Sequence, residues 1–212
     1  MIERILPACV ATAAAYADPP EAALLPGEED AVARAVEKRR LEFTTVRWCA
    51  RRALAELGVP PAPIPRGERG APCWPDGVVG SMTHCDGYRA AAVARARELA
   101  SLGIDAEPHA PLPDGVLDAI ARAEELPHLD GLRRASPGVH WDRLLFCAKE
   151  AVYKAWFPVT RRWLGFEDAA LAFDPAGTFT ARLLVRDAPF ASLDGRWTAG
   201  NGLIATAIAV EP

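Results

Sequence analysis

The amino-acid sequence predicts an α+β fold. Strand and helix patterns alternate irregularly along the 212 residues, whereas a doubly wound parallel sheet requires a regular alternation of the two. Asn201-Gly202 lies between two apolar strand patterns, and this dipeptide is a strong signal for a tight antiparallel hairpin. The length is sufficient for one large domain or for two small ones.

The first half of the chain contains one long helical pattern between strand patterns. This helix begins in an acidic turn, which suits a helix N-terminus, and it stops at Gly58 ahead of a proline cluster. The expected elements are a strand within Leu6–Ala17, a helix over Glu28–Leu57 with a break near Glu42–Thr45, an irregular segment over Pro60–Pro75, and strands at Val78–Met82, Ala90–Ala94 and Ser101–Asp105, the first two joined by a turn at residues 83–87. The apolar Leu6–Ala17 stretch is not expected to be a signal peptide, because no net positive charge precedes it and Pro7 interrupts it.

The second half contains another long helix, followed by strands. Six apolar residues at helical spacing mark its buried stripe: Leu144, Leu145, Ala148, Ala151, Val152 and Ala155. The expected elements are a connector at Pro108–Pro113, a short helix from Asp114 to Ile120, a polar loop over Glu124–Gly138, a helix over His140–Phe157, and strands at Ala169–Phe173, Thr178–Val185, Arg196–Ala199 and Leu203–Val210.

Charge balance and cysteine content restrict the class of protein. The chain has 24 basic and 28 acidic residues, so we do not expect it to bind nucleic acid through bulk positive charge. No apolar run is long enough to span a membrane. The five cysteines are odd in number and form no Cys-x-x-Cys pair, which fits a reduced, cytoplasmic protein better than a disulfide framework or a zinc site.

Two carboxylates lie at the predicted exit of the strand that begins at Ser101. Asp105 and Glu107 are two residues apart, so a strand directs both side chains from the same face. Pro108 ends the strand and places the pair near solvent. Taken alone, such a pair is most often simply solvated.

The helix over His140–Phe157 adds further charged groups. Glu150 and Lys154 lie one turn apart, and Lys149 is beside them. A Glu–Lys pair at this spacing is common on helix surfaces, but three carboxylates and two lysines together suit a divalent cation bound to a phosphorylated substrate. Mg²⁺ prefers carboxylate and phosphate oxygens, while lysines neutralise the remaining phosphate charge.

These two segments resemble the signature motifs of one enzyme family. Residues 103–107 (GIDAE) and 146–155 (FCAKEAVYKA) are similar, in order and in separation, to the motifs of the Sfp-type 4′-phosphopantetheinyl transferases. Three further segments resemble parts of the same family: residues 38–47, 70–85 and 163–166. The likeness covers nearly the whole chain and is closest to the actinobacterial members, which serve polyketide, peptide and fatty-acid carrier proteins.

The resemblance implies two similar α+β halves related by a pseudo-twofold axis, with the active site in the cleft between them. We expect residues 1–103 to contact the nucleotide of coenzyme A. Residues 104–212 are expected to carry the metal site, the lysine helix and the surface on which a carrier protein docks. A monomer is expected, because the two halves supply the cleft.

The resemblance also implies the reaction. The family transfers the 4′-phosphopantetheine arm of coenzyme A to a serine of an apo acyl or peptidyl carrier protein and releases adenosine 3′,5′-bisphosphate. Asp105, Glu107 and Glu150 match the family's ligands of Mg²⁺, for which Mn²⁺ is an alternative. Glu150 is also the candidate general base. Lys149 and Lys154 match the family's pyrophosphate-binding lysines. The resemblance also implies that Lys154 is catalytic, together with Glu150.

A second group of residues resembles the family's contacts to the nucleotide and 3′-phosphate of coenzyme A. Arg39 and Arg47 are eight residues apart, so one helix presents both on the same side. Arginine binds phosphate through two parallel hydrogen bonds. Thr83 and His84 occupy the position of the family's nucleotide-binding histidine segment.

One position departs from the family pattern. Sfp-type enzymes often have a lysine where this chain has Ala71. Arg66 or Arg69 is expected to supply the missing cation from the same loop. Arg66 is favoured because it matches a basic position of the actinobacterial branch.

The carrier protein is expected to dock against the polar loop over Glu124–Gly138. Apolar contacts would come from Leu126, Leu129 and Leu132, and Arg133 and Arg134 would meet acidic residues of the carrier. A flexible loop with solvated arginines is the alternative for this segment.

Two other classes of function stay open on the residues alone. A metal-dependent phosphohydrolase of a small phosphorylated metabolite would use the same carboxylates and lysines, with water in place of the carrier. A nucleotide-binding or carrier-docking module without catalysis is the other alternative.

Overall fold

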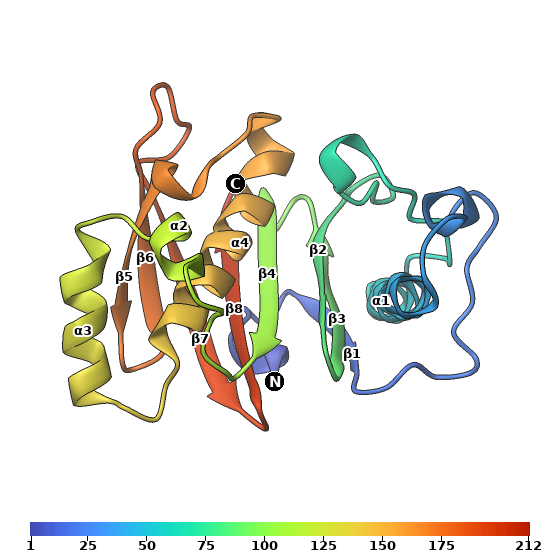
Figure 1. The fold of residues 1–212 in the computed structure, drawn as a ribbon. Coiled ribbons are helices and arrows are strands. Elements are labelled where there is room, and N and C mark those ends of the chain that lie inside the picture. The colour runs from blue at the N-terminus through green and yellow to red at the C-terminus, as the bar shows by residue number, and fades with distance from the viewer.

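Two antiparallel sheets and four α-helices make up the structure, a computed structural model that describes all 212 residues (Figure 1). The elements are β1 Ala11–Ala15, α1 Glu37–Glu56, β2 Val78–Cys85, β3 Tyr88–Arg95, β4 Ser101–Pro108, α2 Val116–Ile120, α3 Glu125–Ala135, α4 Trp141–Thr160, β5 Ala169–Asp174, β6 Thr178–Leu183, β7 Ser192–Gly200 and β8 Leu203–Val210. The predicted α+β class is confirmed. None of the helices has the length and apolar character needed to cross a membrane.

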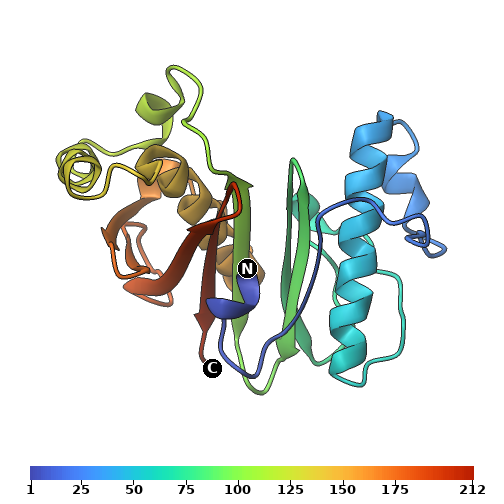
Figure 2. The same cartoon turned by 90° about the horizontal axis from the view of Figure 1, so that it is seen from below.

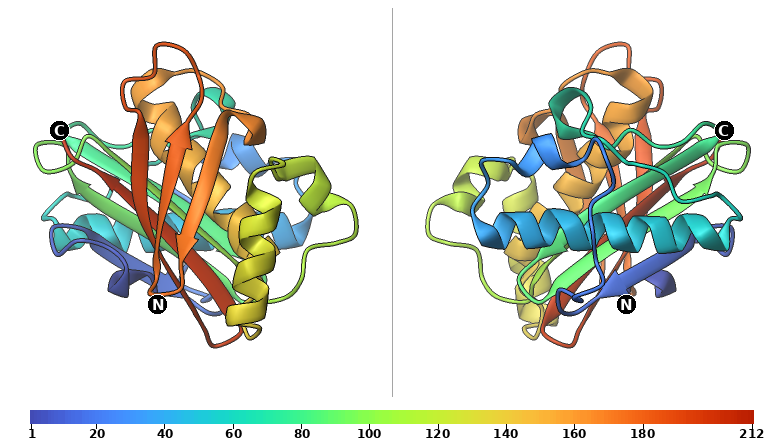
Figure 3. Two further views of the ribbon diagram at one scale, coloured as in Figure 1. Left: turned by 90° about the vertical axis from the view of Figure 1, so that its left-hand side faces the viewer. Right: turned by 90° about the vertical axis from the view of Figure 1, so that its right-hand side faces the viewer.

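The sheets stand side by side, each covered by one long helix. The small sheet has the strand order β1-β3-β2, and the large one has the order β4-β8-β7-β6-β5. In Figure 2, α1 covers the outer face of the small sheet and α4 covers the outer face of the large one. Figure 3 shows α1 lying across the strands of its sheet, and α3 beside β5. Each half of the chain therefore supplies one sheet and one long helix.

Apolar side chains fill the spaces between these layers. Strand β3 shows how alternation serves two layers at once: Ala91 and Val93 pack towards α1, while Ala90 and Ala92 pack towards the large sheet. The largest cluster lies between the large sheet and α4, around Trp141 and other buried side chains. The layers are thus held by apolar burial on both faces of β3.

Hydroxyl groups of β2 join the two sheets at the position of the predicted carboxylates. The Ser81 hydroxyl accepts a hydrogen bond from the Ile104 amide at 3.0 Å, and the Thr83 hydroxyl accepts one from the Ala106 amide at 3.1 Å. All four residues are buried. Strand β4, which carries Asp105, is therefore held against the N-terminal half by side chains rather than by a strand ladder.

The predicted boundary at residues 103/104 falls inside β4. All eight residues of this strand pair with β8, from Ser101 opposite Val210 to Pro108 opposite Leu203. A boundary in the turn between β3 and β4 leaves the strand intact, and we propose the division there.

The first predicted helix begins later than expected and has no internal break. A separate 3₁₀ turn spans Glu29–Val32, and α1 then runs unbroken from Glu37 to Glu56. The break predicted near residues 42–45 is absent, because the Thr45 hydroxyl finds a partner outside the helix: it donates to Asp18 at 2.7 Å. The threonine therefore does not compete for the backbone of its own helix.

The predicted polar loop over residues 124–138 is wrong, because the segment contains the helix α3. Leu129 and Leu132 lie on one face of α3 and are buried in the core of the large sheet. Pro127 is tolerated because it lies in the first turn, where its missing N–H is not needed. The same burial corrects the docking prediction, since neither leucine is free to contact a carrier.

The predicted turn at residues 83–87 is also too long. Strand β2 continues to Cys85, so Thr83 and His84 belong to the strand, and Asp86-Gly87 alone make the turn. Gly87 has a φ of +72°, which glycine adopts without strain. The hairpin predicted at Asn201-Gly202 is confirmed, with φ values of 53° and 74°.

Candidate active site

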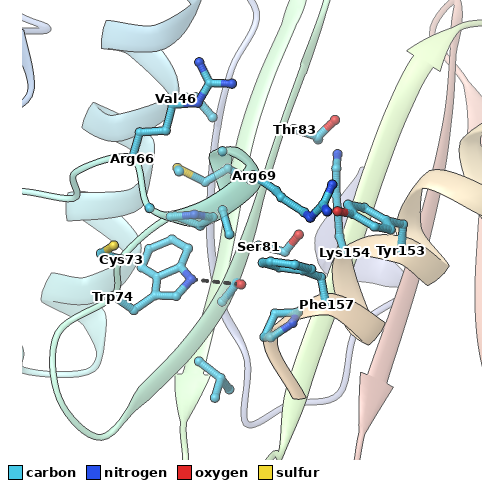
Figure 4. A pocket seen from close by; sticks show the side chains of 18 of the residues that line it. Val46, Arg66, Arg69, Cys73, Trp74, Ser81, Thr83, Tyr153, Lys154 and Phe157 are labelled. Atoms are coloured by element: carbon cyan, nitrogen blue, oxygen red, sulfur yellow. Dashed lines mark hydrogen bonds between the residues drawn. The ribbon is translucent and has the colours of Figure 1, made fainter. Parts of the chain in front are cut away.

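A cavity of about 710 Å³ opens between the two halves. Its walls come from α1, the loop between α1 and β2, strand β2, the Asp105 position of β4, and the C-terminal part of α4 (Figure 4). Eight of the residues predicted from the sequence line it: Arg39, Arg47, Arg66, Thr83, His84, Asp105, Glu150 and Lys154. Two predicted residues, Glu107 and Lys149, do not line it.

Asp105 and Lys154 form a partly buried ion pair at the base of the cavity. The Lys154 ammonium donates to Asp105 Oδ1 at 2.7 Å and to the Ile104 carbonyl at 3.1 Å. The Thr83 hydroxyl donates to the same Asp105 oxygen at 2.9 Å. Burial alone would lower the pKa of Lys154, but Asp105 and then Glu150 outweigh it and raise the pKa. The lysine is therefore a stable cation.

The second oxygen of Asp105 and the Glu150 carboxylate are left available. Asp105 Oδ2 is buried and has no hydrogen-bond partner. Burial raises the pKa of Glu150, an effect that Lys154 opposes and the Asp105 charge reinforces. Burial raises the pKa of Glu107 as well, and the charge of Asp105 is the second cause of that rise. Carboxylates that raise one another's pKa concentrate negative charge that a cation would relieve.

Glu107 is held away from the cavity by an arginine that the sequence reasoning did not identify. Arg143 donates to Glu107 Oε2 at 3.0 Å, and it also donates to the Ala110 and Pro111 carbonyls at 3.1 and 2.8 Å. Helical spacing places Arg143 on the same side of α4 as Glu150 and Lys154, seven and eleven residues on. That spacing is a signal from which the residue could have been found.

These residues fit a divalent cation in chemistry, although they are not gathered around one point. No group of three or more histidine, cysteine or acidic side chains is arranged to hold a metal ion. The unpartnered Asp105 oxygen and the Glu150 carboxylate nevertheless offer hard oxygen donors at the cavity, which are the ligands that Mg²⁺ prefers.

The opposite wall carries the predicted nucleotide-binding cations. The Arg39 guanidinium contacts His84 Nε2, and Glu42 lies 3.4 Å from His84 Nδ1 and 3.7 Å from Arg39. Burial and then the Arg39 charge lower the pKa of His84 to about 4, so the imidazole is neutral at pH 7. Glu42 was not predicted as a site residue. Its spacing of three residues from Arg39, typical of an ion pair on a helix, would have indicated the contact.

Arg47 is the most deeply buried cation of this wall. Its guanidinium donates to the Ile64 carbonyl at 2.8 Å and lies 3.2 Å from the centre of the Phe43 ring. Burial lowers its pKa to about 10, against the charge of Glu28, so Arg47 stays charged at neutral pH. The Arg66 side chain lies at the same end of the cavity, next to Val46 (Figure 4).

Lys149 is not placed to bind pyrophosphate. It is buried in the C-terminal half, where its ammonium donates to the carbonyls of Ile120, Phe166 and Ala169 at 2.9, 2.8 and 3.1 Å. It also pairs with Glu125 at 2.9 Å. Its donors are occupied inside the protein, so the structure does not support the predicted contact.

Tyr153, Phe157 and Trp163 form an aromatic side of the cavity region. Tyr153 stacks on Phe157 at 5.8 Å between ring centres and lies 5.1 Å from Trp163. Tyr153 and Phe157 line the cavity together with Glu150 and Lys154. Residues 150, 153, 154 and 157 share one face of α4, a spacing that would have predicted the two aromatic residues.

Comparison with known sequences decides the family. Residues 27–94 match the profile described as the 4′-phosphopantetheinyl transferase N-terminal domain, and residues 101–207 match that of the 4′-phosphopantetheinyl transferase superfamily. The chain belongs to this family. Residues 95–100, between the two profiles, contain the turn before β4, where the two sheets also divide.

Three relatives that match nearly the whole chain come from actinobacteria, as the sequence resemblance indicated. The 4′-phosphopantetheinyl transferase Svp of Streptomyces mobaraensis is 57% identical, over 99% of this chain and 89% of its own length. PptT of Mycobacterium tuberculosis is 53% identical, over 98% of this chain and 97% of its own length. Npt of Nocardia iowensis is 53% identical, over 99% of each chain.

Proposed function

We propose that this transferase moves the 4′-phosphopantetheine group of coenzyme A to a serine of apo acyl and peptidyl carrier proteins, with Mg²⁺, and releases adenosine 3′,5′-bisphosphate. The observation that carries the proposal is the state of Asp105. One of its oxygens is held by Lys154 and Thr83, and the other is buried without a partner beside a cavity of nucleotide size.

The nucleotide is proposed to bind at the wall formed by α1 and β2. Arg39, Arg47, Arg66 and His84 supply cations and a hydrogen-bonding imidazole for the 3′-phosphate. A phosphate beside the neutral His84 would favour its protonation, which adds a charged hydrogen bond on binding. Thr83 takes a different role from the predicted nucleotide contact, because its hydroxyl positions Asp105.

Asp105, Glu107 and Glu150 are the proposed ligands of Mg²⁺, with Mn²⁺ as the alternative. When bound, the ion neutralises charge on the pyrophosphate oxygens and so favours departure of the bisphosphate. Lys154 of α4, which is held by Asp105, would contribute a fixed positive charge to the pyrophosphate. Glu107 would share its carboxylate between this site and Arg143.

Glu150 is the proposed general base. The serine hydroxyl attacks the β-phosphorus of coenzyme A, its proton passes to Glu150, and the bond from the β-phosphorus to the bridging oxygen breaks. Burial raises the pKa of Glu150, which makes the carboxylate a better proton acceptor than an exposed one. Transfer then depends on positioning and charge neutralisation rather than on a covalent enzyme intermediate.

The proposed enzyme is a cytoplasmic monomer that needs neither nucleic acid nor a membrane. One chain supplies both walls of the cavity, which supports the monomer. All five cysteines are free, which supports a reducing compartment. Carrier docking is proposed on the C-terminal half, where Leu126 and Arg134 of α3 remain exposed.

Incubation with coenzyme A, Mg²⁺ and an apo acyl carrier protein tests the function, with the carrier mass as the readout. A gain of one phosphopantetheine group is the expected result. Release of inorganic phosphate without carrier modification would instead identify a phosphohydrolase, and no chemical change would identify a binding module. Asp105→Asn is the matched control, since it keeps the size of the side chain while removing its charge; the variant should leave the carrier unmodified.

A further inference from the structure

The cationic side chains that line the cavity differ in how many of their donors are already bonded within the protein. The guanidinium of Arg39 contacts His84, that of Arg47 donates to backbone carbonyls, and the ammonium of Lys154 donates to Asp105. Arg66 and Arg69 lie on the loop between α1 and β2, and their guanidinium groups enter no ion pair or hydrogen bond. Their donors are therefore available to a ligand.

The two loop arginines serve opposite ends of the cavity. Figure 4 shows the Arg66 side chain beside Val46 of α1, at the end proposed for the nucleotide. The Arg69 side chain instead extends across the cavity, towards Lys154 and Tyr153 of α4. Arg69 thus brings a free cation from the N-terminal half to the end where Asp105 and Glu150 lie.

The backbone of the loop makes this divergence possible. Arg69 has φ 51° and ψ 21°, a left-handed backbone conformation that residues other than glycine rarely adopt. Next to it, Gly70 has a φ of +83°, and a Cβ there would lie 2.9 Å from the Arg66 Nε atom. Glycine therefore lets the Arg66 guanidinium pass against the loop. Backbone strain of this kind is often found at active sites and ligand-binding positions.

Aromatic residues of the C-terminal half hold the Arg69 guanidinium in place. Its carbon lies 5.4 Å from the centre of the Trp163 ring, and Trp163 contacts Tyr153 at 5.1 Å. The Tyr153 hydroxyl is buried without a partner. Burial raises the pKa of Tyr153, and the nearby Arg69 charge opposes that rise. Trp163 is 61% exposed, so this contact lies at the solvent-facing edge of the site.

We propose that Arg69 binds the pyrophosphate of coenzyme A, opposite Lys154, in the place that the sequence pattern assigned to Lys149. The inference rests on the proposed function and adds a substrate-binding residue to it. The planar guanidinium offers several donors to neighbouring phosphate oxygens, and an unpaired one loses no internal contact when the ligand binds. Trp163 is a positioning residue, because it orients this group before the substrate arrives.

The test compares affinities for coenzyme A and 3′-dephospho-coenzyme A by titration calorimetry. Arg69→Gly is the informative variant, because glycine adopts φ 51° without strain and the fold should be at least as stable as the wild type. We expect this variant to bind both ligands more weakly by the same factor, about tenfold or more. Arg66→Gln, the matched control from the same loop, should weaken coenzyme A but spare the dephosphorylated ligand.

Different outcomes separate this inference from the proposed function. If Arg69→Gly weakens the binding of coenzyme A but not of the dephosphorylated form, the residue binds the 3′-phosphate and the proposal is overturned. Unchanged affinity for both ligands overturns it equally. A wild-type enzyme that neither binds coenzyme A nor modifies a carrier would instead refute the function itself. Trp163→Leu should lower the affinity of the wild type for coenzyme A about threefold, since the tryptophan acts through the arginine. The same substitution should leave the affinity of the Arg69→Gly variant unchanged. An equal loss in both backgrounds would show that Trp163 contacts the ligand directly and does not position Arg69.

Discussion

Replacement of Lys149 by methionine should destabilise the transferase while leaving its active site intact. The Lys149 and Glu125 side chains are each 2% exposed, and the ammonium lies 2.9 Å from a carboxylate oxygen. Glu125 also accepts hydrogen bonds from the Arg122 and Leu171 amides, both at 2.7 Å. These amides keep the carboxylate in place after the lysine is lost, so a buried negative charge remains without its partner.

The magnitude follows from this geometry. Removing one member of a buried ion pair typically costs about 3–5 kcal/mol, and three backbone carbonyls lose their donor as well. For a domain of this size, about 1 kcal/mol shifts the melting temperature by roughly 2–4 °C, so a fall of about 6–20 °C is expected. The kcat of the folded fraction should stay near that of the wild type, because Lys149 does not line the cavity.

Thermal unfolding followed by circular dichroism, together with carrier modification at low temperature, checks both parts. Lys154→Met is the matched comparison, since it makes the same substitution five residues later on the same helix. It should lose transfer with a smaller fall in melting temperature, because 27% of the Lys154 side chain is exposed. A Lys149→Met protein that melts within about 2 °C of the wild type but transfers poorly would refute the reasoning.

Three further predictions concern single residues. Stability should fall as the pH drops from about 6.5 to about 4, because burial and then Arg39 lower the folded pKa of His84 and the unfolded state takes up the proton first. His84→Gln should flatten that part of a melting-temperature profile, and an unchanged profile would contradict the assignment. Gly103→Ala should reduce the free energy of unfolding by about 1–3 kcal/mol and so lower the denaturation midpoint, because its Cβ would lie 2.1 Å from the Ala151 carbonyl. An unchanged midpoint would exclude this close approach of β4 and α4. Glu150→Ala should reduce transfer by about 100-fold or more with the helix intact, as measured by carrier mass and circular dichroism, and near-normal turnover would remove it from the site.

The part of the site that follows from local periodicity was predictable from the sequence. A spacing of four on a helix places Glu150 and Lys154 on one face, whereas the family resemblance placed Asp105 beside them; all three line the cavity. The hairpin at Asn201-Gly202 was predictable from local turn chemistry, because Asn and Gly adopt the two positive φ values that the turn needs.

The errors arise where distant contacts decide the outcome. Lys149 is adjacent to Glu150, but consecutive helical residues project about 100° apart, so Lys149 points away from the cavity and meets Glu125. The helix α3 forms because Leu129 and Leu132 gain burial against the core, which the polar character of the segment concealed. Glu107 does not line the cavity, because Arg143 of α4 pairs with its carboxylate, and no local spacing relates these two residues.

The apolar cluster between the two sheets has a consequence for how the transferase unfolds. It joins Ile2 and Ile5 of the N-terminal 3₁₀ turn to Tyr88 of β3, Ile104 of β4 and Leu203 of β8. Separation of the halves would expose this entire surface, so we expect neither half to be stable without the other. The chain should melt in one cooperative step, and a ligand that binds in the cavity should raise the melting temperature of both sheets together.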